Sequence, residues 1–192
     1  MKRTFLLING SKYGCEGNTQ TLMDEAAERL ANYGEVQWLH LTEGVSVEAA
    51  ENALRAASAI VIGTGTYWDS WGSPLQRFLE DMTHTEGTDC WIGKPVAVLI
   101  TMHSVGGKAV LSRLQGVLNT FGALIPPMCG IVYSAVAHAA LRGEENAITE
   151  DLWRQSDLDI ICHNLNESCN HANKWRSWPV ERQHFSDKWL KR

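Results

Sequence analysis

The chain has 192 residues, 44% of them hydrophobic and 20% charged, which suits one globular domain with a proper core. Its formal net charge of −5 argues against nucleic acid as the main partner, because binding a phosphate backbone requires a basic face. No apolar stretch approaches the roughly 20 residues of a membrane-spanning helix, so no membrane partner is expected. Five cysteines without a CxxC pair favour a reducing compartment, and we expect a cytoplasmic protein.

Strand and helix patterns alternate along the first two thirds of the sequence. Nearly continuous apolar runs or alternating residues predict strands at 4–9, 35–41, 58–63 and 94–102. Apolar residues at helical spacing predict helices at 19–33, 47–57, 74–82 and 108–121. Gly34 and Gly122 are expected to end the first and last of these helices, and Ser73 with Gln76 forms a possible capping box for the third.

The C-terminal third is less regular. We expect a fifth strand at 123–133, interrupted by Pro126 and Pro127, then a loop at 134–146 and a long helix at 148–172. Residues 173–192 are rich in Trp, Arg and Lys and are interpreted as a C-terminal arm on a domain of residues 1–172. Two interpretations of the arm stay open: it clasps a second subunit of a homodimer or homotetramer, or it folds back over its own sheet.

Five alternations of strand and helix indicate an α/β fold with a parallel sheet, helices on both faces and right-handed crossovers. For the strand order 2-1-3-4-5, the topological switch point lies between the first and third strands. Ligands bind such sheets outside the carboxyl ends of the strands at that point. The loops after the first, third and fourth strands should therefore meet at one rim.

Each of these three loops has an unusual composition. The first, NGSKYGCEGNT at 9–19, joins a strand to a helix through small and polar residues, and a helix N-terminus suits an anionic group such as phosphate. An ordinary turn capped by Asn18 or Thr19 is the alternative. The second, TGTYWDSWG at 64–72, offers the flat rings of Tyr67 and Trp68. The third, at 101–107, contains glycines that allow close approach of a ligand. Together they suit a flat heteroaromatic mononucleotide.

Three segments carry a resemblance to a known family. GSKYGCEGNTQTL at 10–22, TGTYWDSWGSPLQRFLED at 64–81 and the GKPV strand at 93–96 with the loop after it resemble the flavodoxin-like NAD(P)H-dependent flavin reductases and quinone reductases. The resemblance covers roughly 4–126. Gly65 stands where the family usually has proline, and Gln76 stands where many members have lysine. The cysteine cluster that binds an iron–sulfur centre in some relatives is absent from the sequence.

The resemblance implies FMN as cofactor, NADH or NADPH as electron donor, and a quinone, a flavin or a similar small molecule as acceptor. It implies that the FMN phosphate binds at Ser11, Lys12, Gly17, Asn18 and Thr19. It places the isoalloxazine ring near Thr66, Tyr67, Trp68, Ser70, His103, Ser104 and Gly106. No catalytic residue is named, because the flavin performs the redox chemistry. A flavodoxin-type electron carrier and a flavin-free binding module remain as alternatives.

Several other residues invite a functional interpretation. Trp71 and Trp91 could shape a substrate cavity, although packing at a rim or interface is the stronger reading. Cys15 in the first loop is expected to be a small neutral filler rather than a reactive thiol. A metal at Cys162, His163, Cys169 and His171 is not expected, because one straight helix cannot make four ligands converge, and no metal site is predicted.

Overall fold

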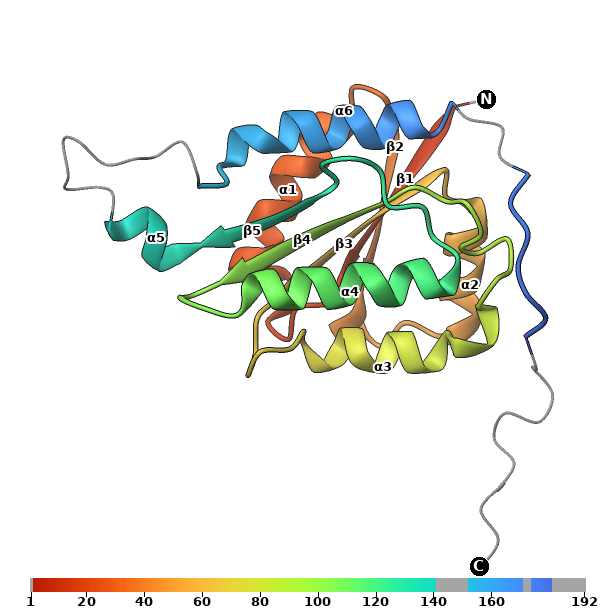
Figure 1. Ribbon diagram of the computed structural model, residues 1–192, viewed down its shortest axis with the longest axis horizontal. Coiled ribbons are helices and arrows are strands. Elements are labelled where there is room, and N and C mark those ends of the chain that lie inside the picture. The colour runs from red at the N-terminus through yellow and green to blue at the C-terminus, as the bar shows by residue number, and fades with distance from the viewer. Residues whose placement is uncertain (1, 141–151, 171–173, 181–192) are drawn as a thin grey trace, which may run out of the picture.

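The computed structural model describes residues 2–140, 152–170 and 174–180. Five parallel strands form one sheet in the order β2-β1-β3-β4-β5 (Figure 1). The strands are β1 (Arg3–Asn9), β2 (Gly34–His40), β3 (Ala59–Gly65), β4 (Val96–Met102) and β5 (Gly130–Ser134). This confirms the flavodoxin-like sheet predicted from the sequence.

Helices cover both faces of the sheet. On one face lie α1 (Asn18–Leu30) and α6 (Leu158–Ser168), and on the other α2 (Val47–Ala56), α3 (Ser73–Asp81) and α4 (Gly107–Phe121) (Figure 1). Each layer has its own apolar core against the alternate residues of the strands. A short helix α5 (Ala135–Ala140) follows β5, and the described residues also form the 3₁₀ turns η1 (Gly14–Glu16), η2 (Leu41–Glu43), η3 (Thr83–Thr85) and η5 (Gln155–Asp157).

Gly34 has a different role from the one predicted. Helix α1 ends at Leu30, and Gly34 begins β2, paired with Arg3 of β1. A Cβ atom at Gly34 would collide with the Arg3 carbonyl oxygen. The glycine is therefore explained by close approach of two backbones rather than by helix capping. Gly122 does end α4 in the left-handed conformation, with φ of 110°.

The sequence also misplaced the boundaries at the C-terminal end of the domain. The fifth strand begins at Gly130 and not at 123, because Pro126 and Pro127 have no backbone N–H to donate to β4 and Met128 turns the chain at φ 59°. Leu124 forms only an isolated bridge with Pro95. Residues 135–140, expected in a loop, form α5, and 141–146 lie outside the described residues.

The helix predicted at 148–172 is too long in its described part. Residues 152–154 are not helical, and α6 runs only from Leu158 to Ser168, after the turn η5. The Asp157 carboxylate accepts a hydrogen bond from the Arg154 amide (2.8 Å), a local contact that competes with continuous helix. Residues 148–151, 171 and 172 lie outside the described residues.

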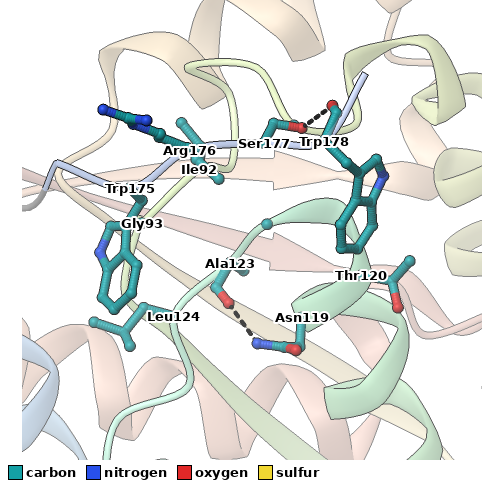
Figure 2. Close-up of a pocket in the computed structure, with 12 residues that line it drawn as sticks. Ile92, Gly93, Asn119, Thr120, Ala123, Leu124, Trp175, Arg176, Ser177 and Trp178 are labelled. Carbon is teal, nitrogen blue, oxygen red and sulfur yellow. Dashed lines mark hydrogen bonds between the residues drawn. The ribbon is translucent and has the colours of Figure 1, made fainter. Parts of the chain in front are cut away.

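The described part of the C-terminal arm, 174–180, runs along its own domain (Figure 1). The Trp175 indole lies over Gly93, and the Trp178 indole nitrogen donates to Glu86 Oε1 (3.1 Å). The two indoles flank a cavity of about 190 Å³ above the end of α4 and the segment before β4 (Figure 2). These contacts are those of an arm that folds back onto its own domain, away from the carboxyl ends of the strands.

Candidate functional site

A cleft of about 310 Å³ opens at the carboxyl ends of the strands, at the predicted switch point. It lies among the β1–α1, β3–α3 and β4–α4 loops and the end of β5. Its lining consists of Ser11, Tyr13, Asn18, Thr19, Thr21, Leu22, Gly65, Thr66, Tyr67, Thr101, Met102, His103, Tyr133, Ala135 and Gln155.

The β1–α1 loop is shaped by Asn9, the buried last residue of β1. Its side-chain amide donates to the Gly14 carbonyl (3.1 Å) and to Gln20 Oε1 (2.7 Å), and its Oδ1 accepts from the Ser11 amide (2.9 Å). These three bonds hold the loop against the start of α1. Ser11 is consequently buried with its hydroxyl facing Tyr67, 3.2 Å from the Tyr67 hydroxyl.

The N-terminus of α1 faces the cleft without a side-chain cap. Gly17 is the N-cap residue in an extended conformation, and no side chain hydrogen-bonds across this helix start, so capping by Asn18 or Thr19 is not observed. No acidic residue lies in the first turn. The Thr19 hydroxyl instead lies 2.7 Å from the Thr101 hydroxyl on β4. Uncapped amides at the positive end of a helix are suited to an anion.

Tyr67 forms one wall of the cleft because Gly65 leaves room for it. A Cβ atom at Gly65 would stand about 3 Å from the Tyr67 ring and hydroxyl. The departure from the family's proline therefore lets the Tyr67 ring fold back over the end of β3. The Lys12 ammonium lies 5.0 Å from the Tyr13 ring centre and 5.5 Å from that of Tyr67, within range of cation–π attraction.

Thr66 lines this cleft and carries a buried polar atom without a hydrogen-bond partner. Among the described residues, its hydroxyl is the buried side-chain group that has no hydrogen-bond partner. Leaving a buried hydroxyl unpaired costs about 1–3 kcal/mol, so such atoms are rare and point to a missing partner. The cleft thus has an aromatic wall at Tyr67 and, in its lining, a residue whose buried hydroxyl lacks a hydrogen-bond partner.

The β3–α3 loop has a strained tip. Tyr67 and Ser70 exchange two backbone hydrogen bonds of 2.8 and 2.9 Å, which closes a two-residue turn. Both central residues are left-handed, Trp68 at φ 49° and Asp69 at φ 56°, and Trp68 is fully exposed. Asn-Gly is the usual choice for such a turn, so a tryptophan here is unusual.

The β4–α4 loop closes the cleft from the other side. Gly106 is left-handed (φ 87°) and precedes α4, and a Cβ atom there would collide with the Asp69 carboxylate. The two loops are thus in direct contact through Asp69 and Gly106. The Arg113 guanidinium also donates to the Asp69 carbonyl, which ties α4 to the strained turn. His103 is exposed at the rim of the cleft.

Half of the cofactor residues predicted from the sequence line the cleft: Ser11, Asn18, Thr19, Thr66, Tyr67 and His103. The other six, Lys12, Gly17, Trp68, Ser70, Ser104 and Gly106, lie on the same three loops beside it. Sequence reasoning missed Tyr13, Thr101, Met102, Tyr133 and Gln155. Thr101 and Met102 end β4, so the rule that ligands bind at carboxyl ends could have found them. Gln155 follows a non-helical segment and carried no such signal.

The two tryptophans considered for a substrate cavity have different positions. Trp91 is completely buried, donates its indole N–H to Thr85 Oγ1 (2.8 Å) and packs on Phe121, so it belongs to the core. Trp71 is half-buried, and its indole N–H donates to Gln76 Oε1 (2.8 Å). Gln76, which replaces the family's lysine and was expected in a capping box, thus anchors Trp71 instead.

The cysteines lie in different environments. Cys15 is exposed in η1, and partial burial together with the Glu43 carboxylate raises the pKa of its thiol, so the thiol is not activated. Cys162 is buried against α1, whereas His163 beside it is exposed, so these two side chains do not converge. His171 lies outside the described residues.

Comparison with known proteins supports the flavin interpretation of this cleft. Residues 4–138 match the model of a family described as NADPH-dependent FMN reductase. The chain belongs to this family. A search of curated proteins returned no significant match.

Solved structures share the fold of this FMN reductase. An oxidoreductase from Corynebacterium diphtheriae superposes with a TM-score of 0.66 at 14% identity, covering 88% of this chain and 98% of that one. A WrbA-like flavodoxin from Agrobacterium tumefaciens gives 0.61 at 18% identity, covering 88% and 96%. An NADH:FMN oxidoreductase in its apo form gives 0.59 at 17% identity, covering 88% and 87%.

Family membership makes this protein an NAD(P)H-dependent flavoprotein reductase that uses FMN. The cleft fits that cofactor on its own evidence: an uncapped helix N-terminus for the phosphate, an aromatic wall and the unpaired Thr66 hydroxyl. In the described part of the chain, no helix has both the length and the apolar character to cross a bilayer.

Proposed function

We propose that the enzyme passes the two electrons of an NAD(P)H hydride, by way of FMN, to a quinone, a free flavin or a similar small planar acceptor. The observation that carries this proposal is the unpaired Thr66 hydroxyl in an aromatic cleft beside an uncapped helix start. When bound, FMN supplies the two-electron redox chemistry. The chain's own residues bind FMN, orient it and shield it.

The phosphate is assigned to the β1–α1 loop. The Ser11 hydroxyl, the Asn18 amide and the first amides of α1 would donate to phosphate oxygens, with Gly17 allowing close approach. Lys12 adds the positive charge of the loop and is steered toward the cleft by its contacts with Tyr13 and Tyr67. Its side chain is exposed, so its electrostatic contribution is modest.

The isoalloxazine ring of FMN is assigned to the space between the β3–α3 loop and the β4–α4 loop. Thr66 and Tyr67 would contact it on one side, and His103, with the backbone at Ser104 and Gly106, on the other. Trp68 lies within the strained turn at the rim, and Ser70 closes that turn. An exposed Trp68 indole beside the open cleft suits stacking with a flat ring, which favours planar acceptors and the nicotinamide.

An anaerobic titration tests the function. The purified protein should show flavin absorbance after incubation with FMN, and NADH or NADPH should bleach it. Adding a quinone should restore the absorbance, with one quinone molecule consumed per nicotinamide oxidised. A protein whose flavin neither nicotinamide reduces would be an electron carrier, and one that takes up no FMN would be a binding module.

A second experiment tests the phosphate assignment. Replacing Asn18→Asp together with Thr19→Glu places two negative charges where the phosphate is assigned, so FMN affinity should fall at least a hundredfold. The pair Lys174→Ser with Arg176→Ser, on the distant arm, changes the net charge by the same two negative units and should leave FMN affinity unchanged. Equal affinities in the two variants would reject the assignment.

We further propose a reducing compartment such as the cytoplasm and assembly as a homodimer or homotetramer. All five thiols are free, which agrees with a reducing compartment. Equilibrium sedimentation of the purified protein measures its assembly directly, and a monomer at micromolar concentration would contradict the proposed oligomer.

A further inference from the structure

A cluster of three metal-ligating side chains lies outside the cleft, on the far side of the β1–α1 loop. Cys15 of η1, His40 at the end of β2 and Glu43 of η2 each offer one ligand atom, and these atoms all lie within 4.8 Å of one another. Among the described residues, no second group of three such side chains comes this close. The three residues come from two segments separated by an entire helix and strand.

The distances from the Cys15 sulfur to the other two ligand atoms match those of a tetrahedral metal site. Cys15 Sγ lies 3.4 Å from His40 Nδ1 and 3.7 Å from Glu43 Oε1. Around a zinc ion, with Zn–S of about 2.3 Å and Zn–N or Zn–O of about 2.0–2.1 Å, ligand atoms at the tetrahedral angle stand about 3.6 Å apart. The two separations that involve the Cys15 sulfur are therefore already nearly those that a bound ion would impose, and the ligand atoms of His40 and Glu43 lie within 4.8 Å of each other.

Local structure holds the cluster in this geometry. Gly14 is left-handed at φ 53°, and a Cβ atom there would stand 2.5 Å from the Thr42 hydroxyl, so η1 and η2 can approach only because residue 14 is glycine. The Asn9 side chain fixes the Gly14 carbonyl. The His40 ring stacks on Trp38, with centres 5.1 Å apart and planes 8° apart, which orients its Nδ1 toward Cys15.

We propose that Cys15, His40 and Glu43 bind a divalent transition-metal cation of the zinc type. A thiol and an imidazole favour Zn²⁺ or Co²⁺ over Mg²⁺ and Ca²⁺, which prefer oxygen ligands. Cys15 and Glu43 are exposed, so the fourth coordination position is open to water. The cation would bridge the loop assigned to the FMN phosphate and the segment after β2.

Metal binding is tested with the flavin-loaded protein after removal of any polyhistidine tag. Zn²⁺ is titrated by calorimetry, and Co²⁺ is added while the difference spectrum is recorded against the same sample before addition. One equivalent of each should bind. Co²⁺ should give thiolate-to-metal charge transfer and intense tetrahedral bands in the difference spectrum.

Ligand variants and matched controls decide the outcome. Cys15→Ser should abolish the charge-transfer band, and His40→Gln or Glu43→Gln should weaken Zn²⁺ binding at least tenfold. Cys169→Ser and His163→Gln remove a half-buried thiol and an exposed imidazole elsewhere, and both should bind metal like the unchanged protein. Absence of binding at micromolar free Zn²⁺, or a cobalt spectrum unchanged by Cys15→Ser, would overturn the proposal.

Discussion

At the scale of single residues, the Thr66 hydroxyl is the most informative atom of the cleft, because it is buried without a partner. Thr66→Val keeps the shape and removes the unpaired group. The FMN-free protein should therefore be as stable as the unchanged one or more stable, by up to about 1 kcal/mol. FMN affinity should fall about tenfold if the ligand supplies the missing hydrogen bond. Chemical denaturation and flavin fluorescence titration measure the two quantities.

Thr64 provides the control for this substitution. Thr64 lies two residues before Thr66, and its hydroxyl is buried. This hydroxyl accepts a hydrogen bond from the Gly72 amide (3.0 Å) and faces the Gly10 carbonyl (3.4 Å). Thr64→Val should lower the free energy of unfolding by about 1–2 kcal/mol, because the Gly72 amide loses its acceptor. A loss of the same size for Thr66→Val would show that the Thr66 hydroxyl is satisfied without FMN.

Because of two buried thiols, the free energy of unfolding should fall as the pH rises in the alkaline range. Burial raises the pKa of Cys129 and of Cys162 from 9.0 to about 12. In the unfolded chain these thiols ionise near pH 9, whereas in the folded protein they stay protonated. Their contribution is therefore fully present below pH 9 and is lost as pH rises from 9 to 12. At pH 10 the free energy of unfolding should be lower than at pH 8 by about 1 kcal/mol for each of the two thiols.

The pH dependence is checked with Cys129→Ala. Urea unfolding at pH 8 and pH 10 should show a fall in stability that is about 1 kcal/mol smaller in the variant than in the unchanged protein. Val132→Ala removes buried volume from β5 without a titratable group, so its cost should be the same at both pH values. An equally steep fall in Cys129→Ala would contradict the raised pKa.

At the scale of elements, the turn between β3 and α3 combines strain with exposure. Holding a residue such as Trp68 in the left-handed conformation costs about 1–2 kcal/mol, and full exposure means that its side chain regains nothing by packing. Trp68→Gly should stabilise the protein by about 1 kcal/mol. If the indole stacks with nicotinamide or acceptor, kcat/KM should fall about tenfold while FMN affinity stays unchanged.

Met128 is a matched control for Trp68. It is also left-handed (φ 59°) and exposed, but it lies before β5 and does not line the cleft. Met128→Gly should give a similar gain in stability with unchanged kcat/KM. Should Trp68→Gly keep full activity toward every acceptor, the stacking role would be rejected.

The turns η1 and η2 connect the proposed metal site to the proposed phosphate site. Cys15 lies two residues before Gly17, the N-cap of α1, so a cation on Cys15, His40 and Glu43 would restrain the loop that binds FMN. Zn²⁺ should therefore tighten FMN binding several-fold in the unchanged protein and have no effect in Cys15→Ser. Flavin fluorescence titrations with and without Zn²⁺ test this, and equal affinities would show that the two sites are independent.

The sequence predicted elements well where burial alone determines them. β1, β3 and β4 are largely buried, so apolar runs marked them clearly, and the alternation with helices then indicated a parallel sheet. The predicted boundaries were wrong at β5 and α6, where Pro126, Pro127 and the contact between Arg154 and Asp157 override local preference. Thr66 shows the same limit within the site, because its missing partner is visible only in three dimensions.

At the scale of the whole molecule, the remaining question is what the C-terminal arm holds. Trp175 and Trp178 are 57% and 60% exposed, so roughly two fifths of each side chain is covered by the arm's own domain (Figure 2). Replacing both with serine should lower the free energy of unfolding by about 2 kcal/mol, from the apolar area returned to water. Since the contacts lie within one chain, this loss should not depend on protein concentration.

Sedimentation together with urea unfolding at two protein concentrations separates this arrangement from an arm that clasps a second subunit. Arg176→Ser, a change at an exposed position between the tryptophans, serves as the control and should alter neither stability nor mass in solution. If the double substitution halves the mass in solution, or if its cost grows with protein concentration, the arm is part of a subunit interface. If the mass in solution is unchanged and the loss in free energy of unfolding is the same at both protein concentrations, the half-exposed indoles are held by Gly93 and Glu86 of the same chain. The free indole faces would then line a surface cavity at the end of the molecule opposite the flavin cleft.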